Sequence, residues 1–217
     1  MSELTDRRRE EKDRRRSEIL DAAAAAAAEG GFDAITMDQV ARRARLSRAL
    51  VYVYFEDKAA LYLALYERAL ELLLEQFARA TRDAPNGLAR VAAMANAYVA
   101  FSQEHGVHFE ALARFEARSA TDLQAVPDRC LELGDASHAH LIAAIRDGIA
   151  DGTVRADVGP PDAVAVALWG FMHGVIQIAA TKAGLLIHRN TDAVQLHEHA
   201  LALTLRAIAN VGPVPQA

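Results

Sequence analysis

Several side chains between positions 36 and 58 have the chemistry that binding to a nucleic acid requires. Arg48 carries a guanidinium that can donate two parallel hydrogen bonds to the edge of a guanine. The Tyr52 hydroxyl can donate to a phosphate oxygen, and Lys58 supplies a point charge. Thr36 stands where a helix is expected to begin, and a helix N-terminus attracts anions. These residue types favour contact with both the backbone and the bases of DNA.

Two short predicted helices joined by a tight turn position these side chains. The run Thr36-Met-Asp-Gln has the form of a capping box, so a helix is expected to start there. After the turn Arg45-Leu46, Ser47 is a good N-cap for a helix over 48–54. This is the helix-turn-helix arrangement, in which the second helix lies in the major groove. A helix about 10 Å across fits that groove, which is about 12 Å wide.

The rest of the sequence also indicates helices. The predicted fold class is therefore all-α, with a three-helix DNA-binding domain followed by a helical bundle. Alanine and leucine are abundant, and both are strong helix formers. A first helix over 17–29 ends at Gly30-Gly31, and a long fourth helix runs from Asp57 to about Arg82. Further helices are expected at 88–105, 107–119, 127–151, 161–184 and 192–210. The predicted division is a flexible charged arm over 1–16, the DNA-binding domain over 17–58, and a ligand-binding and dimerisation domain over 59–217.

The charge is unevenly distributed along the chain. Residues 1–58 hold twelve basic and twelve acidic side chains, whereas residues 59–217 hold twelve and seventeen and therefore carry the whole net charge of −5. The segment 7–16 is itself net positive, and either contacts phosphate or is a solvated tail. This division permits DNA binding, because a local positive face matters more than the total charge.

The run from Thr36 to Leu61 resembles the DNA-binding domain of the tetracycline-repressor (TetR) family. The resemblance covers about residues 17–62 and includes the Ala-x-x-Ala helix, Ser47, Tyr-Val-Tyr-Phe at 52–55 and Lys58. It implies DNA contacts from Thr36, Arg48, Tyr52 and Lys58. The further candidates for DNA contact on the same turn and helix are Arg45, Ser47, Ala49, Leu50 and Tyr54.

Three of these candidates carry a qualification. Tyr54, like Phe55, is alternatively a core residue of the three-helix unit. Arg45 stands where the family often has glycine, so some strain is expected in the turn. Leu50 replaces a hydroxyl residue that often contacts phosphate; with Ala49 it can instead contact thymine methyl groups.

The second half shows none of the common catalytic or phosphate-binding motifs, so no enzyme activity and no cofactor are predicted. Its Trp169-Gly-Phe-Met-His173-Gly174 segment resembles the Trp…His-Gly signature of one branch of TetR-type C-terminal domains. The resemblance implies a homodimer that binds a small molecule. Two apolar stripes are expected to form a four-helix interface with their symmetry mates. They consist of Val166, Trp169, His173, Ile176 and Ala180 on one helix and Leu201, Leu205 and Ile208 on the last.

The effector pocket is expected to be mostly apolar, with a few polar groups. The wall residues predicted for it are Met94, Phe101, His105, Phe109, Phe115, Met172 and Gln177. No metal site is predicted, because neither Cys nor carboxylate residues complete the pair His105 and His108. The charge-free stretch 163–181 is long enough to suggest a membrane span, but His173 and Gln177 in its middle favour a helix buried by protein.

These observations predict a cytoplasmic transcriptional repressor that a largely apolar effector releases from a palindromic operator. An activator is the alternative, because the sequence does not reveal where the operator lies relative to a promoter. The alternatives from other classes are a non-specific DNA-compacting protein and a helical enzyme with a DNA-binding appendage. The single cysteine, Cys130, excludes an internal disulfide framework and fits a reducing compartment.

Overall fold

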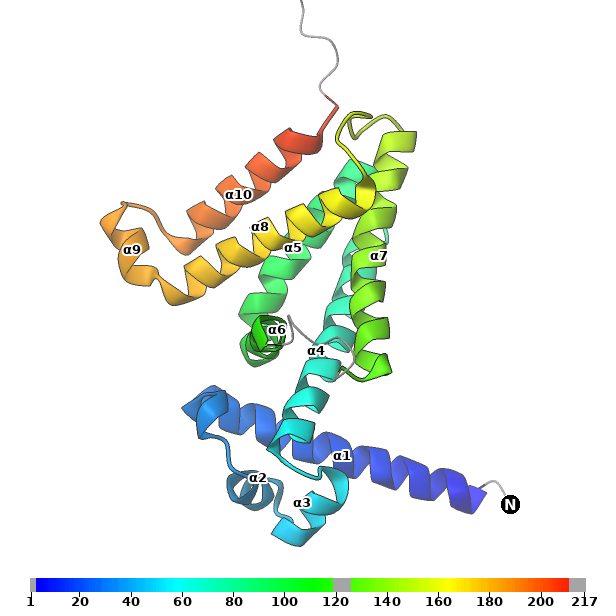
Figure 1. Cartoon of the computed structure of the whole chain (residues 1–217), viewed down its shortest axis with the longest axis vertical. Helices are drawn as coiled ribbons and strands as arrows, with labels where there is room; N and C mark the ends of the chain where they lie inside the picture. Colours follow the sequence, from blue (N-terminus) through cyan, green and yellow to red (C-terminus); the bar gives the residue numbers. More distant parts are fainter. Residues whose placement is uncertain (1–2, 119–125, 211–217) are drawn as a thin grey trace, which may run out of the picture. The chain divides into compact units, whose positions relative to one another are not determined.

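The computed structural model describes residues 3–118 and 126–210, and shows an all-helical chain over these residues, as predicted (Figure 1). The only strand-like pairing in the described segments is an isolated bridge between Val154 and Ala209. Residues 1–2 of the predicted arm, and 119–125 and 211–217 of the predicted ligand-binding domain, lie outside the described residues. In chain order the elements are α1 (Glu3–Gly30), η1 (Phe32–Ala34), α2 (Met37–Ala44), α3 (Arg48–Tyr54), α4 (Lys58–Thr81), α5 (Gly87–Glu104), α6 (Gly106–Arg118), α7 (Asp128–Ala150), α8 (Pro161–Thr181), α9 (Ala183–His188) and α10 (Ala193–Ile208).

The helices form two compact units. The N-terminal unit comprises the described residues up to Leu70 together with those from His105 to Cys130. The C-terminal unit comprises Glu71–Glu104 and the described residues from Leu131 onward. This division differs from the predicted boundary at 58/59. The first turns of α4 and the helix α6 belong with the DNA-binding helices, because Leu61, Leu65 and Ala111 are part of the same apolar core.

The core of the N-terminal unit is built from the apolar faces of α1, α2, α3 and α4. Its fully buried side chains include Ile19, Leu20, Ile35, Val40, Val51, Leu61 and Leu65. Phe55 ends α3 and is also buried, so the chain turns from α3 into α4 over an apolar plug. Burial of each such side chain contributes about 1.5–3 kcal/mol to the stability of the fold. Because α2 and α3 both bury side chains in this core, the core holds the two helices at a fixed angle.

The predicted flexible arm over 1–16 is wrong for its described part, because residues 3–16 continue α1 as regular helix. Its charges alternate at helical spacing and form a ladder of ion pairs. Arg14 bonds Glu11 at 2.6 Å and Glu18 at 2.7 Å, and Arg15 bonds the same two carboxylates at 3.1 and 2.9 Å. Each exposed pair adds only about 0.3–0.5 kcal/mol, but several in one helix support it without apolar contacts.

In the C-terminal unit, α8 packs against α5 and α10, and the crossing of α5 and α7 is unusually close. A Cβ added to Gly87 would lie 2.0 Å from the backbone nitrogen of Gly148, so only glycine fits there. The expected helix over 161–184 ends earlier, at Thr181, whose hydroxyl bonds the Gln177 carbonyl at 2.6 Å. Lys182 then leaves the helical conformation, and the separate helix α9 follows.

Candidate nucleic-acid interface and effector site

The turn between α2 and α3 has the geometry of a helix-turn-helix. Thr36 forms the predicted capping box: its hydroxyl accepts from the Gln39 N–H at 3.2 Å, and the Gln39 side chain accepts from the Thr36 N–H at 2.9 Å. The Ser47 hydroxyl accepts from the Leu50 N–H at 3.2 Å, as expected for an N-cap. Arg45 adopts the left-handed conformation, with φ 57°. This is the position at which the resemblance to the TetR family leads one to expect glycine. The turn geometry is therefore kept, and the strain is borne by Arg45.

Arg48 lies at the exposed start of α3 and is held by two neighbours. Its Nε lies 3.3 Å from Oδ1 of Asp38 on α2, and its Nη2 donates to the Tyr52 hydroxyl at 3.4 Å. The guanidinium carbon lies 5.4 Å from the centroid of the Tyr52 ring. The hydrogen bond to Tyr52 and the charge of Asp38 both raise the pKa of Arg48. Asp38 and Tyr52 thus orient the Arg48 guanidinium in the absence of DNA. An oriented guanidinium suits bidentate contact with a guanine.

An apolar surface accompanies Arg48 on the outer face of α3. Ala49 and Leu50 are exposed, as their predicted contact with thymine methyl groups requires. Val53 is 77% exposed and was missed from the sequence. Its spacing of three and four residues from Leu50 and Ala49 places it on their face and could have identified it.

Two other predicted DNA contacts have partners within the N-terminal unit. Lys58 Nζ donates to the Asp33 carbonyl at 2.9 Å and lies 5.2 Å from the Tyr62 ring centroid. Tyr54 is half-buried and packs against the core, which agrees with its alternative interpretation. Lys58 must leave the Asp33 carbonyl, or share it, to reach a phosphate.

The seven predicted wall residues of the effector pocket are divided between the two units. His105, Phe109 and Phe115 belong to the N-terminal unit. Met94, Phe101, Met172 and Gln177 belong to the C-terminal unit. There, Met94 and Phe101 are buried in α5, and Met172 lines a pocket of about 170 Å³ with residues of α5 and α10. The periodicity that selected these residues identified buried faces and could not show which of them share a cavity.

A cluster of aromatic and imidazole rings lies inside the C-terminal unit, on α4, α5, α7 and α8. Tyr98 bonds Nδ1 of His173 through its hydroxyl at 2.7 Å, and its ring centroid lies 6.3 Å from that of Phe77. Trp169 lies 5.8 Å from His173 and 5.2 Å from His138, between ring centroids. We call these five residues the ring cluster.

Two residues that adjoin Phe77 and His138 of the ring cluster in the sequence carry buried polar atoms without partners. Burial lowers the pKa of His173, so its imidazole is neutral near pH 7. Among the described residues, the buried Gln76 Oε1 and Ser137 Oγ have no hydrogen-bond partner. Unpaired buried polar atoms are costly, and a bound molecule can satisfy them.

Some members of the predicted dimer stripes are covered within the unit itself. Ile176 and Ile208 are each only 2% exposed, and His173 is bonded to Tyr98 of its own chain. Val166 and Ala180 of the predicted stripe are exposed, and the solvent face of α8 extends from them around the helix. It carries Ala163, Ala167, Gly170, Phe171, Gly174 and Ile178, most of them exposed.

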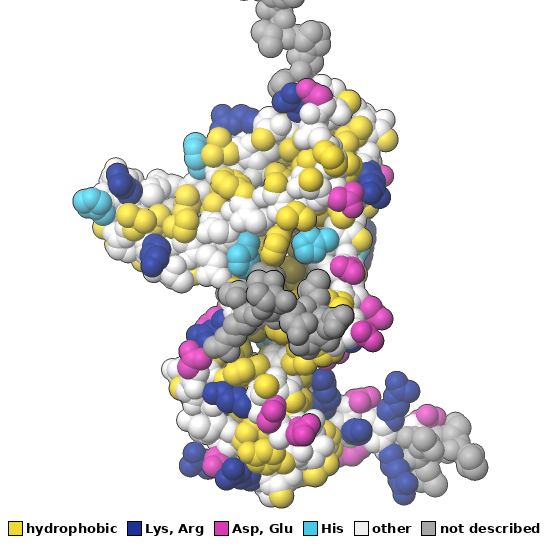
Figure 2. Space-filling model, viewed as in Figure 1, with side chains coloured by type: hydrophobic (Ala, Val, Ile, Leu, Met, Phe, Trp, Pro, Cys, Tyr) yellow, Lys and Arg dark blue, Asp and Glu magenta, His cyan; other side chains and the backbone are white. Residues whose placement is uncertain are grey.

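Exposed apolar side chains continue from α8 over α9 and α10, as the yellow side chains in Figure 2 show. They are Val166, Phe171 and Ile178 on α8, Leu185 and Ile187 on α9, and Val194 and Leu203 on α10. A Cβ added to Gly170 or Gly174 would meet nothing within 4 Å, so a second helix has room to approach closely. We call this surface the α8–α10 face.

No group of three or more His, Cys, Asp or Glu side chains that could hold a metal ion occurs among residues 3–118 and 126–210. His105 and His108 are neighbours, with ring centroids 6.0 Å apart.

Two family descriptions match the chain. Residues 19–65 match the bacterial regulatory proteins of the tetR family, and residues 91–204 match the tetracyclin repressor-like C-terminal domain. The second match alone spans more than half of the chain. The chain belongs to the TetR family.

Individual proteins agree with this assignment. The HTH-type transcriptional activator FasR of Mycolicibacterium smegmatis is 29% identical over 106 residues, which are 47% of this chain and 48% of FasR. The chain therefore aligns with about half the length of this curated relative. A protein of unknown function from Rhodococcus sp. RHA1 has 25% identity and a TM-score of 0.74, over 90% of this chain and 95% of that one.

The structure of SmeT, the repressor of the Stenotrophomonas maltophilia multidrug efflux pump SmeDEF, shares the fold of this TetR-family protein. Its TM-score is 0.66 at 23% identity, over 93% of this chain and 94% of SmeT. SmeT is also known in a complex with triclosan.

Proposed function

We propose that this TetR-family protein is a homodimeric transcriptional repressor that binds a palindromic operator through α3 and is released by a small, largely apolar effector. The observation that carries the proposal is the arrangement at the start of α3. Asp38 and Tyr52 hold the Arg48 guanidinium beside an exposed apolar face that contains Val53. A directed cation next to methyl-contacting side chains suits recognition of base edges in the major groove.

The ring cluster supports an effector site in the C-terminal unit. Aromatic walls favour an apolar or aromatic molecule, while a neutral His173 and the unpaired Gln76 and Ser137 oxygens can fix its orientation. SmeT, which shares the fold, is known with the aromatic compound triclosan. We infer that the effector here is likewise bound for its apolar body and one or two hydrogen-bonding groups.

The α8–α10 face supports a dimer. The helix α8 is the one helix of the described chain that is long and apolar enough to cross a membrane. His173 in its middle is bonded to α5, and the helix packs on α10, so we assign its open face to a second copy instead of lipid. Two recognition helices related by a twofold axis then meet successive major grooves about 34–36 Å apart.

An activator is the second candidate, and one specific observation favours it: the matched relative FasR is named an activator. The same recognition helix serves either role, because the position of the operator relative to the promoter decides whether binding represses or activates transcription. We further propose that the protein acts in the cytoplasm and catalyses no reaction.

A selection of genomic fragments with the purified protein at near-physiological salt, followed by footprinting, tests the proposal. We expect a short palindrome to be enriched, and a matched Arg48→Ala variant to lose that enrichment. Placement of the palindrome over a promoter would support repression, and placement upstream would support activation. Uniform, salt-sensitive binding without enrichment would contradict the proposal and favour a DNA-compacting role.

A further inference from the structure

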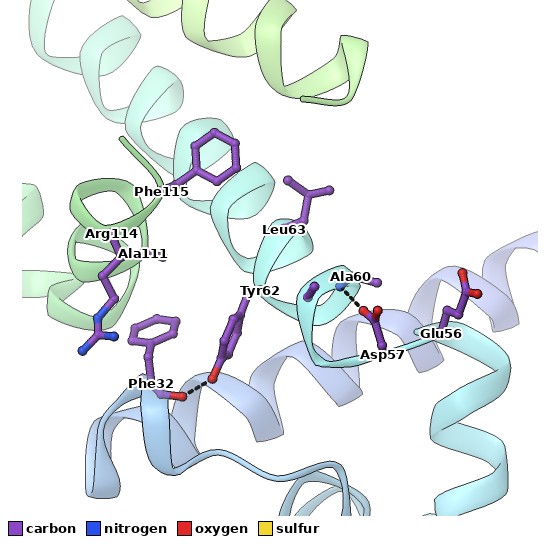
Figure 3. A pocket seen from close by; sticks show the side chains of 10 residues that line it. Phe32, Glu56, Asp57, Ala60, Tyr62, Leu63, Ala111, Arg114 and Phe115 are labelled. Carbon is purple, nitrogen blue, oxygen red and sulfur yellow. Dashed lines mark hydrogen bonds between the residues drawn. The ribbon is translucent and has the colours of Figure 1, made fainter. Parts of the chain in front are cut away.

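A pocket of about 480 Å³ lies within the N-terminal unit, bordered by η1, the start of α4 and α6 (Figure 3). It shares no residue with the ring cluster of the C-terminal unit. Its lining residues are Phe32, Glu56, Asp57, Ala59, Ala60, Tyr62, Leu63, Ala111, Arg114 and Phe115. The volume is in the range of pockets that bind small organic molecules.

The pocket is walled by aromatic rings and floored by small residues. Phe32 and Tyr62 meet edge to face, with ring centroids 5.5 Å apart, and the Tyr62 hydroxyl bonds the Phe32 carbonyl. Phe115 stacks on Tyr66 at 3.8 Å between centroids, which fixes its ring. The three alanines of the lining leave the space that these rings enclose. Such walls favour an apolar, aromatic ligand body.

The charges around the pocket favour a cation over an anion. Glu56 and Asp57 present exposed carboxylates on the side formed by the start of α4 (Figure 3). Two cations lie at the pocket. Arg114 bonds Asp33 at 3.0 Å and Glu110 at 2.7 Å, so two carboxylates balance its charge. Lys58 Nζ lies 5.2 Å from the Tyr62 ring centroid, and Glu56 and Asp57 outnumber this second cation. Asp57 uses Oδ1 to cap the Ala60 N–H at 2.7 Å, and its charge remains. The lining and these ion pairs together are net negative.

We propose that this pocket is a binding site for an aromatic organic cation, distinct from the effector site of the C-terminal unit. The aromatic body occupies the space between Phe32, Tyr62 and Phe115. The cationic group lies toward Glu56 and Asp57, where it gains two charge interactions without displacing an existing ion pair.

The position of the site connects it to the recognition helix. Glu56 and Asp57 form the link between α3 and α4, and Lys58, a predicted phosphate contact, follows immediately. A ligand bound beside Glu56 and Asp57 therefore contacts the segment that follows the end of α3. This step rests on the proposed function, and linkage requires that operator DNA and the cation change each other's affinity by the same factor.

Two fluorescent probes with the same anthracene body and opposite charge test the site: (9-anthrylmethyl)trimethylammonium and 9-anthracenecarboxylate. Each is titrated into the full-length protein without DNA. We expect saturable binding of the cation that is at least about tenfold tighter than binding of the carboxylate. Equal or tighter binding of the carboxylate would overturn the assignment of charge.

Variants locate the binding. Glu56→Gln with Asp57→Asn removes both charges, and Asn keeps the N-cap; we expect cation affinity to fall about tenfold. Ala60→Leu fills the pocket and should abolish binding. The matched controls Glu75→Gln and Ala80→Leu change the exposed side of α4 outside the pocket and should bind as wild type. Thermal unfolding confirms that each variant folds.

Cation binding that is unaffected by all pocket variants would overturn the proposal, since the probe would then lie elsewhere. Because the titration contains no DNA, its result is independent of the operator selection. Failure of the cation to bind leaves the proposed regulatory function untouched, and failure of the selection leaves the pocket untouched.

Discussion

Arg45 is a non-glycine residue held in the left-handed region, at φ 57° and ψ 39°, where its N–H closes α2. A side chain there costs about 1–2 kcal/mol, partly offset by the lower entropy of an unfolded arginine. We expect Arg45→Gly to raise the free energy of unfolding by about 0.5–1 kcal/mol, measured by urea denaturation. Arg42→Gly, inside α2, is the control and should lower it by about 1 kcal/mol. A loss of stability in Arg45→Gly would show that the turn is not strained.

His108 gives the protein a pH-dependent stability. Burial, and then the charges of Arg68 and His105, lower its pKa to about 4. The unfolded state takes up a proton near pH 6.5 and the folded state only near 4, so this contribution is complete above pH 6.5 and is lost as the pH falls toward 4. The full shift corresponds to about 3 kcal/mol, which solvent screening at this half-buried ring reduces to about 1–2 kcal/mol.

The variant His108→Leu removes this proton uptake. Between pH 7 and pH 5 we expect wild type to lose about 1 kcal/mol more unfolding free energy than His108→Leu, by urea denaturation at each pH. Identical losses in the two proteins would show that His108 does not titrate in this way.

At the residue scale, local chemistry was predictable and distant partners were not. The caps Thr36, Ser47 and Asp57 follow from sequence spacing alone, because each bonds a backbone N–H three residues ahead. The partners Asp38 of Arg48 and Asp33 of Lys58 depend on how separate segments meet. No sequence pattern marks those contacts.

At the scale of helices, most boundaries were predictable because glycine, proline and capping residues set them locally. Two errors have physical causes. The sequence predicts a loose arm for the N-terminal part of α1 because this segment lacks apolar residues, although its ion pairs support a helix. The end of α8 and the separate α9 were missed because Lys182 carries no helix-ending signal.

The close crossing of α5 and α7 predicts how two glycine substitutions change the stability of the protein. Gly87→Ala would force its Cβ against the Gly148 backbone, so we expect a loss of about 3 kcal/mol or more of unfolding free energy, or no folding. Gly134→Ala in α7, where a Cβ meets nothing within 4 Å, should instead stabilise by about 0.5–1 kcal/mol. Similar effects from both substitutions, by thermal unfolding, would contradict the close contact.

At the scale of the whole molecule, the sequence predicts two functional halves that meet at 58/59, whereas the compact units of the structure divide the chain after Leu70, Glu104 and Cys130. The unit that contains the recognition helix also includes the first half of α4 and α6, so a pocket lined by α4 and α6 lies in the same unit as α3. The sequence predicts that α8 is apolar, but its solvent face could not be predicted, because both sides of the helix are apolar.

The α8–α10 face predicts the oligomeric state. Ile178→Glu places a charge in the proposed interface, so we expect this variant to sediment as a monomer at concentrations where wild type is a dimer. Val53→Glu, an equally drastic change of an exposed apolar residue on α3, should remain dimeric. A dimeric Ile178→Glu variant would place the interface elsewhere.

The central claim, sequence-specific DNA binding through α3, is tested most directly by one affinity ratio. The Kd for the selected operator duplex is compared with that for a scrambled duplex of the same length and at the same near-physiological salt. We expect a ratio of about a thousandfold or more for wild type, and a decrease of about 10- to 100-fold in that ratio for Arg48→Ala. A wild-type ratio near one, or a ratio that Arg48→Ala leaves unchanged, would contradict the account.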